Sequence, residues 1–334
     1  MRQSFLRSFI FAALILLVFV PINANAQKHF KHDSTYYSTY HQSFIPRLYV
    51  SKKNTSFTLP ALASSTTDLK YKANNRTKGG VGLIYKFFSL DLGYDFDFLN
   101  PTDNDEKGET KGLNMQFHIY PRKWVIDAVG LFQKGFYLST NDYFPGKPGS
   151  YTYRKDVKQD FVNIAAYRVR NADKFSYRAA MVQNEWQKKS AGSLLYGGQA
   201  YYGSLRGDSA LVPKALENKF AQAGIKKVSF FSAGAGVGYA HTLVIDQHFF
   251  IMASLVGNLN LNFSTEEGSK KDNKTSVGPA AIYKASIGYN SDGWSISGNY
   301  AGNAYFTKGA SSDDYYYMPS DNFRLVLEKK LGRR

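Results

Sequence analysis

Three carboxylates, Asp91, Asp95 and Asp97, occupy alternate positions of one segment whose other residues are mostly apolar. Side chains two residues apart lie on one face of an extended strand, so these carboxylates are expected to point the same way. If paired with cations on other strands, they would form an ion-pair network inside a narrow barrel; if unpaired, they would line a hydrophilic route for solutes. The candidate lumen charge network is Asp91, Asp95, Asp97, His118, Arg168 and Arg178.

Ser209 lies in a short block, Gly207 to Leu211, that is similar to the Gly-Asp-Ser-Leu block of a hydrolase family with one alanine inserted. A nucleophilic serine needs a general base and a group that orients the base. No Asp-x-x-His pair follows the block, and Gly-Asp-Ser is common in turns. The sequence therefore predicts a turn here and no catalytic residue.

Neither a metal nor a cofactor is expected. His29, His32 and His41 match no standard ligand spacing, and the chain has no cysteine. Three glycines that alternate within one expected strand have no helix after them, so they do not form the glycine-rich fingerprint of a dinucleotide-binding site. They would instead let the strand pack closely against an interior group; they are Gly234, Gly236 and Gly238.

Apolar residues alternate with polar or small ones along much of the chain. In the segment 89–98, Leu90, Leu92 and Tyr94 alternate with Asp91 and Gly93, and the pattern recurs to the C-terminus. A two-residue period is the period of a β-strand with one apolar face. Fourteen strands are candidates: 44–51, 67–74, 79–87, 89–98, 111–120, 124–135, 160–169, 174–184, 193–205, 228–241, 247–261, 277–290, 293–306 and 322–331.

Many half-apolar strands of about 10 residues predict an all-β fold, an antiparallel transmembrane β-barrel. We expect about 12 strands, in a range of 12 to 14, with the segment before residue 75 outside the regular barrel. Such barrels have short turns at one rim and longer loops at the other. Short links are expected near residues 122, 172, 245 and 291, and a short helix is expected over 213–223.

The N-terminus predicts export. Arg2 and Arg7 precede the apolar run from Phe9 to Val20, and Ala24–Ala26 is a small-x-small cleavage site. These features are typical of a secretory signal peptide over residues 1–26, and the run is shorter than the roughly 20 residues that span a membrane. We expect a flexible segment over residues 27–43 and the barrel domain over residues 44–334.

The chain is basic, with a formal net charge of +16, and 16% of its residues are aromatic. Aromatic residues form belts at both membrane interfaces, and export excludes nucleic acid as a partner. Lysine pairs such as Lys52 with Lys53 and Lys270 with Lys271 lie near strand ends. They fit contact with outer-membrane lipid and lipopolysaccharide phosphates; the alternative for any single pair is a solvated charged loop.

Several short motifs occur in order: GLIYKFFSLDLGYDF (82–96), KGFY (134–137), NADKFSYRAA (171–180), QKKSAGSLLYGG (187–198) and GVGYAHTLV (236–244). With the signal peptide, they resemble an uncharacterised family of Bacteroidota outer-membrane proteins classed as a domain of unknown function. The resemblance runs from about residue 40 to the end. It implies an outer-membrane β-barrel and brings no activity or catalytic residues.

We therefore expect a non-enzymatic outer-membrane protein, either a narrow pore or a structural or binding component of the cell envelope. The alternatives are an outer-membrane enzyme that modifies lipids and a secreted soluble β-sandwich that binds glycans. Besides lipid, the expected partner is the barrel assembly machinery. The oligomeric state is left open.

Overall fold

The computed structural model describes residues 32–40, 44–62, 67–85, 88–100, 107–139 and 151–331. Residues from Asp33 onward form one compact unit. The predicted signal peptide over 1–26 lies outside the described residues. Of the expected flexible segment over 27–43, residues 32–40 are described and include strand β1, Tyr37–Thr39, which pairs with β9, Glu185–Gln187.

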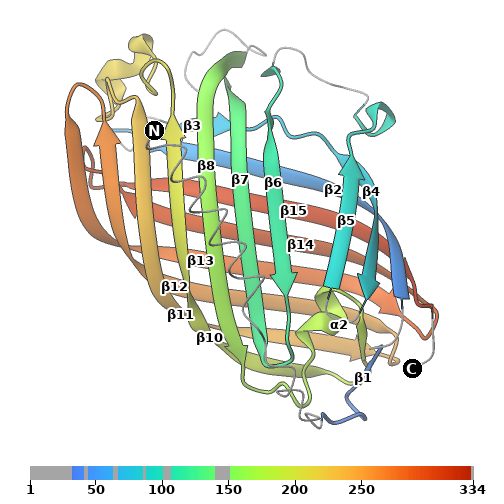
Figure 1. Cartoon of the computed structure of the whole chain (residues 1–334). Coiled ribbons are helices and arrows are strands. Elements are labelled where there is room, and N and C mark those ends of the chain that lie inside the picture. Colours follow the sequence, from blue (N-terminus) through green and yellow to red (C-terminus); the bar gives the residue numbers. More distant parts are fainter. Residues whose placement is uncertain are drawn as a thin grey trace. The chain divides into compact units, whose positions relative to one another are not determined.

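Ten antiparallel strands close into a ring, which confirms the predicted antiparallel barrel (Figure 1). The ring has fewer strands than the 12 expected, because three strands of the 13-stranded sheet, β4 Lys78–Tyr85, β5 Phe88–Tyr94 and β6 Lys111–Ile119, lie beside the ring. The ring closes where β15 pairs with β2, from Tyr317 opposite Thr58 to Glu328 opposite Arg47. Its strands are β2 Phe44–Leu59, β3 Leu69–Lys72, β7 Trp124–Ser139, β8 Tyr151–Val169, β10 Ala191–Arg206, β11 Lys227–Ile245, β12 Phe249–Glu267, β13 Lys271–Asn290, β14 Trp294–Lys308 and β15 Tyr315–Lys329.

The expectation that the segment before residue 75 lies outside the barrel was wrong, because β2 and β3 are members of the ring. The second half of β2 pairs with β3, and its first half pairs with β4, Lys78–Tyr85. β4 pairs in turn with β5, Phe88–Tyr94, and β6, Lys111–Ile119, pairs with β7. In the described part of the chain, β5 and β6 share no pairing, so the wall has a seam between them.

The two ends of the barrel differ only in part as the sequence predicted. At one end, here called the turn end, β11 and β12 are joined by residues 246–248 and β13 and β14 by residues 291–293. The short link expected near residue 172 was wrong, because β8 and β10 are joined by residues 170–190, which hold the helix α2, Tyr177–Met181, and β9. At the opposite end, the loop end, β12 and β13 are joined by only three residues, 268–270, whereas the connection 207–226 is long. There the short 3-10 helix Lys214–Lys219 follows Pro213, which agrees with the helix expected over 213–223.

The strand expected over 174–184 was wrong. Phe175, Tyr177 and Ala179 alternate as in a strand, but the segment holds the short helix α2, Tyr177–Met181. The Ser176 hydroxyl accepts a hydrogen bond of 3.0 Å from the Ala179 amide, which is the N-cap interaction that starts a helix. α2 lies at the turn end (Figure 1). It packs against β12 and β13, and Tyr177 donates a hydrogen bond to Ser254 of β12.

The outer face of the ring is apolar and the inner face is mixed. Along β12, Ile251, Leu255 and Leu259 are exposed on the outside, whereas Met252 and Asn260 are buried inside. Exposed leucine, isoleucine and phenylalanine side chains recur at the outward positions of β11, β13, β14 and β15. A continuous apolar outer band is the surface that a lipid bilayer requires of a barrel.

Aromatic side chains fill the lumen at the loop end. Tyr201 and Tyr305, from β10 and β14, have ring centroids 4.5 Å apart, and Phe57 of β2 lies 6.5 Å from Phe230 of β11. Loop residues of 207–226 cover them from above and are equally buried. We call this cluster the aromatic plug; it consists of Phe57, Tyr71, Phe161, Tyr201, Phe230, Tyr305, Tyr316, Leu211, Val212, Leu216 and Phe220.

Candidate functional site

The six residues of the candidate charge network do not meet in one place. Arg168 lies on the outer face of β8, exposed, with its guanidinium 5.9 Å from the Trp124 ring. β5 ends at Tyr94 and a 3-10 helix follows at Asp97–Leu99, so the three carboxylates do not share one strand face. Asp97 is exposed and pairs with Arg76 at 2.8 Å, while Asp95 lies 3.4 Å from Lys78.

Asp91 is the centre of a half-buried ion-pair cluster, the Asp91 cluster. Arg47 of β2 donates two hydrogen bonds of 2.6 Å to its carboxylate, and Arg324 of β15 donates a third of 2.6 Å. Arg47 also lies 3.8 Å from Glu328, which accepts a hydrogen bond from Ser295. Charge-assisted, bidentate pairs are among the strongest polar contacts in proteins, so this cluster fastens β5 to the ring.

A second cluster, the Asp127 cluster, crosses the lumen. Asp127 of β7 accepts a hydrogen bond of 2.6 Å from Lys284 of β13, and its other oxygen lies 2.6 Å from His118 Nδ1. Tyr120 donates to the same carboxylate at 2.9 Å, and the Lys284 ammonium lies 5.3 Å from the Tyr177 ring of α2. Burial raises the pKa of the Tyr177 phenol, so this ring stays neutral beside the cation.

Arg178 belongs to the turn end. Its guanidinium lies 3.6 Å from Glu185 and donates a hydrogen bond of 3.0 Å to Asn184. Ser176 donates a hydrogen bond of 2.5 Å to the same glutamate. Together with β1 and β9, these contacts fix the segment that covers this end of the lumen. Arg178 is therefore a structural anchor of α2 and lies apart from Asp91.

Between the two ends, buried amide side chains form a belt on β8, β10 and β12. Tyr167 donates a hydrogen bond of 2.7 Å to Asn258, and Asn163 donates one of 3.4 Å to Gln199. Buried amides in proteins are usually hydrogen-bonded, yet in the described residues both polar atoms of the Asn260 side chain have no protein partner. This amide belt comprises Gln159, Asn163, Gln199, Asn258, Asn260 and Asn262.

The alternating glycines of β11 make room for the amide belt. A Cβ added to Gly234 or Gly236 would collide with the side chain of Asn260 or Asn258 on the neighbouring strand. The expectation that these glycines allow close packing against an interior group is thereby confirmed. The belt supplies uncharged donors and acceptors, which suit hydroxyl-rich or amide-bearing molecules.

Lys53 is a buried cation near the seam. Only 8% exposed, it donates a hydrogen bond of 2.8 Å to Asn114 of β6, and in the described residues no carboxylate lies within 4.0 Å of it. The inward positions of β6 are open, since Asn114, Gln116 and His118 are all exposed. At the seam, polar interior groups are thus accessible from the side of the barrel.

The sequence did not predict the partners of Asp91, which are Arg47 and Arg324, or the partner of His118, which is Asp127. The alternation does place Arg324 and Glu328 on the polar face of the last strand, and this was the available signal. Nothing local links Asp127 to Lys284, because a pair on opposite walls depends on the register of every strand between them.

The Ser209 hydroxyl accepts a hydrogen bond of 2.9 Å from Arg154, which also pairs with Asp156. In the described residues, no group of three or more histidine and carboxylate side chains is placed to hold a metal ion. None of the described helices has the length and apolar character needed to cross a membrane.

Comparisons with solved structures return outer-membrane proteins at low similarity. OmpT of Vibrio cholerae is 9% identical, with a TM-score of 0.28, over 86% of this chain and 96% of that one. The toluene transporter TodX of P. putida is 7% identical, with a TM-score of 0.24, over 87% of this chain and 90% of that one. The CymD monoaromatic hydrocarbon channel is 9% identical, with a TM-score of 0.26, over 88% of this chain and 90% of that one. Similarity this low carries no argument about function.

No curated protein matches the chain. A family model described as "Domain of unknown function (DUF4421)" matches residues 31–317, which is most of the chain. The match agrees with the resemblance to an uncharacterised family seen in the sequence. The chain belongs to the family of the domain of unknown function DUF4421.

Proposed function

We propose that the protein is a non-enzymatic, non-conducting barrel of the outer membrane that acts as a binding component of the cell envelope. The observation that carries the proposal is the aromatic plug. Tyr71, Tyr201 and Tyr316 are each at most 1% exposed, and they close the lumen at the loop end. An open pore would leave a continuous polar path between the ends, so a filled barrel is favoured over a pore.

The outer-membrane location is supported by the apolar outer band and by the two kinds of end. In outer-membrane barrels the short turns face the periplasm and the longer loops face outward. We therefore place the turn end of 246–248 and 291–293 in the periplasm and the loop end outside. A cleaved signal peptide over 1–26 and an origin in Bacteroidota are parts of the same proposal.

The binding role is supported by the interior beside the seam. Lys53, Asn114 and Gln116 offer a cation and two amides there. The outer flanks of the seam are apolar, with Leu92 on β5 and Leu113 on β6 both exposed. A molecule with a polar head and an apolar body fits this combination, because its head would enter the interior while its body stays in the lipid.

Planar-bilayer recording of the refolded mature protein tests the proposal. We expect no single-channel steps, because the aromatic plug blocks ion flow. Stable steps of uniform size would contradict it and favour the narrow pore. Heat-modifiable mobility on gels and dependence on detergent are expected as well; a protein that stays monodisperse in plain buffer would instead be the soluble β-sandwich.

The seam can be tested with single cysteines, since the natural chain has none. Gln116→Cys is expected to react with a membrane-impermeant maleimide on protein in detergent, whereas Asn260→Cys in the amide belt is expected to be protected. Equal protection of both would show that the seam is closed. Equal reactivity would show that the lumen as a whole is open to solvent.

A further inference from the structure

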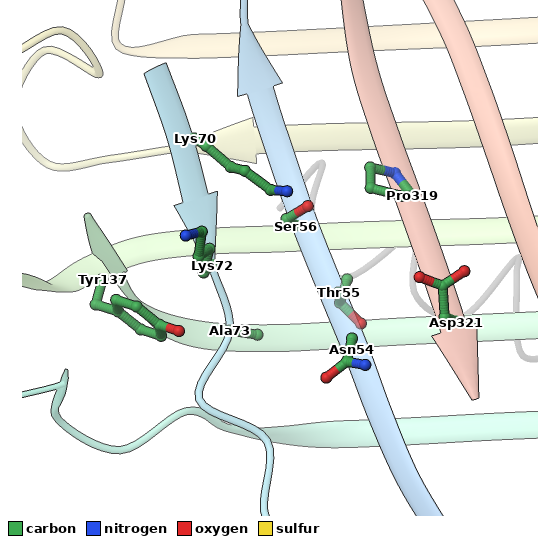
Figure 2. A pocket seen from close by; sticks show the side chains of 9 residues that line it. All are labelled: Asn54, Thr55, Ser56, Lys70, Lys72, Ala73, Tyr137, Pro319 and Asp321. Atoms are coloured by element: carbon green, nitrogen blue, oxygen red, sulfur yellow. The ribbon is translucent and has the colours of Figure 1, made fainter. Parts of the chain in front are cut away.

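A surface pocket of about 230 Å³ lies on the outer face of the ring, near the loop end (Figure 2). It forms where β3, β2 and β15 meet. Leu69 and Tyr71 of β3 are buried inside the barrel, so Lys70 and Lys72, which alternate with them, face outward. The pocket is lined by Asn54, Thr55, Ser56, Lys70, Lys72, Ala73, Tyr137, Pro319 and Asp321.

The pocket combines two cations with neutral donors. Figure 2 shows Lys70 and Lys72 on one wall, the side chains of Asn54 and Ser56 between the walls, and Asp321 on the other wall. Asp321 is already engaged, since it accepts a hydrogen bond of 2.6 Å from Tyr283. In the described residues, the Lys72 ammonium has no hydrogen-bond or ion-pair partner.

The pocket lies next to the edge of the apolar outer band, on its loop-end side. On β15 the outward residues Phe323, Leu325 and Leu327 are exposed, and Asp321 is the next outward position toward the loop end. On β2 the exposed Leu48 and Val50 are followed by outward-facing Lys52 and Asn54. The pocket therefore begins where the apolar surface stops, at the level at which lipid head groups meet a barrel.

We propose that this pocket binds the phosphate group of a lipid in the outer leaflet, with its acyl chains along the apolar surface of β15 and β2. The inference rests on the proposed placement in the outer membrane. Lysine ammonium groups bind phosphate as point charges, and the low dielectric beside the lipid strengthens the attraction. Asn54 and Ser56 add uncharged donors for the remaining phosphate oxygens.

Native mass spectrometry of the full mature protein in detergent tests the site, with dioctanoyl phosphatidic acid as the probe. The test variant is Lys70→Gln/Lys72→Gln. The matched control is Lys270→Gln/Lys271→Gln, which removes the same charge from exposed positions at the same end of the barrel. We expect about tenfold weaker binding for the test variant and no more than about twofold change for the control.

Two further measurements identify the ligand and the polarity of the pocket. Dioctanoyl phosphatidylcholine is expected to compete poorly, because its choline cation neutralises the phosphate charge. Inorganic phosphate is also expected to compete poorly, because it has no acyl chains. Asp321→Asn is expected to bind phosphatidic acid about threefold more tightly, since it removes the one carboxylate of the pocket.

Binding that is equal in the test variant and the control would overturn the proposal. Equal competition by inorganic phosphate would show a general anion site in place of a lipid site. If the proposed outer-membrane location is wrong, the protein is expected to stay soluble without detergent and to show no heat-modifiable mobility on gels. Both results are seen before any lipid is added, so they are distinct from a failure of the lipid site.

Discussion

The two halves of the barrel wall are held together in different ways. In the regular wall, β8 and β10–β15, the strands are 15 to 20 residues long, and β11 pairs with β12 over 19 residues. In the irregular wall, β2–β7, the strands β4, β5 and β6 have only 7 to 9 residues, and β5 and β6 do not pair. Backbone pairing is continuous through the first half. In the second half it is interrupted at the seam, and the ion pairs of the Asp91 and Asp127 clusters add links to the other strands of the ring.

This comparison predicts that single charge substitutions damage the irregular wall more than single polar substitutions damage the regular one. A buried ion left without its partner is costly, since no water is near to solvate it. An amide in the lumen belt is uncharged and has neighbours of the same kind. The predictions below test this difference in order of expected size.

The largest effect is expected for Asp127→Ala, which removes the anion that links the two walls. Lys284 would remain buried without a counter-ion, and we expect a loss of about 3 to 5 kcal/mol in the free energy of unfolding. Urea unfolding in detergent micelles measures it. The double variant Asp127→Leu/Lys284→Met is expected to recover most of the loss, and a double variant as unstable as the single one would contradict this explanation.

Asp91→Asn is expected to lower the free energy of unfolding by about 1.5 to 3 kcal/mol, because the charged hydrogen bonds to Arg47 and Arg324 weaken. It should also speed maleimide labelling of Gln116→Cys, since β5 is less firmly held beside the seam. Asp95→Asn is the matched control, because its 3.4 Å pair with Lys78 lies at the surface. If both variants label at the same rate, the Asp91 cluster does not hold the seam.

In the regular wall, Gly236→Ala is expected to cost about 1 to 3 kcal/mol, since the added methyl group would collide with the Asn258 side chain. Asn258→Ala in the same chain should restore part of the loss. Gly257→Ala adds a methyl group at an outward position with no atom within 4 Å and should leave the melting temperature unchanged. A similar loss in both glycine variants would point to backbone conformation as the cause.

The smallest effect is expected for Ser209→Ala. The residue lies in the connection between β10 and β11 and contacts Arg154, so its loss should change the free energy of unfolding by less than about 0.5 kcal/mol. Turnover of phospholipid by the natural chain should be at background and unaffected by the substitution. Turnover that disappears in Ser209→Ala would instead support the lipid-modifying enzyme.

The alternation of residue types was enough to locate most strands, because one face of each strand meets an apolar surrounding. It did not give the length of every connection, since residues 170–190 and 268–270 join strands at the ends where a short and a long link were expected. It failed at 174–184, where Phe175, Tyr177 and Ala179 are buried by a helix cap and by packing at the turn end. Local periodicity carries no information about such tertiary burial.

The ion pairs of the candidate site and the seam were harder to predict from the sequence than the strands were. Asp91 and His118 do lie in ion-pair clusters, but their partners Arg47 and Asp127 are set by strand pairing. The seam was also hidden, since β5 and β6 have the same alternating pattern as strands that do pair. Whether an edge is paired depends on strands elsewhere in the ring.

The pairing of β2 with β15 joins the earliest and the latest strands of the ring. Until that pairing forms, a partly assembled sheet therefore carries two exposed edges. Contacts between distant segments form slowly, and open edges with apolar faces are prone to aggregate. We expect the chain to need a holding chaperone during its passage to the membrane, and to become resistant to protease in one late step.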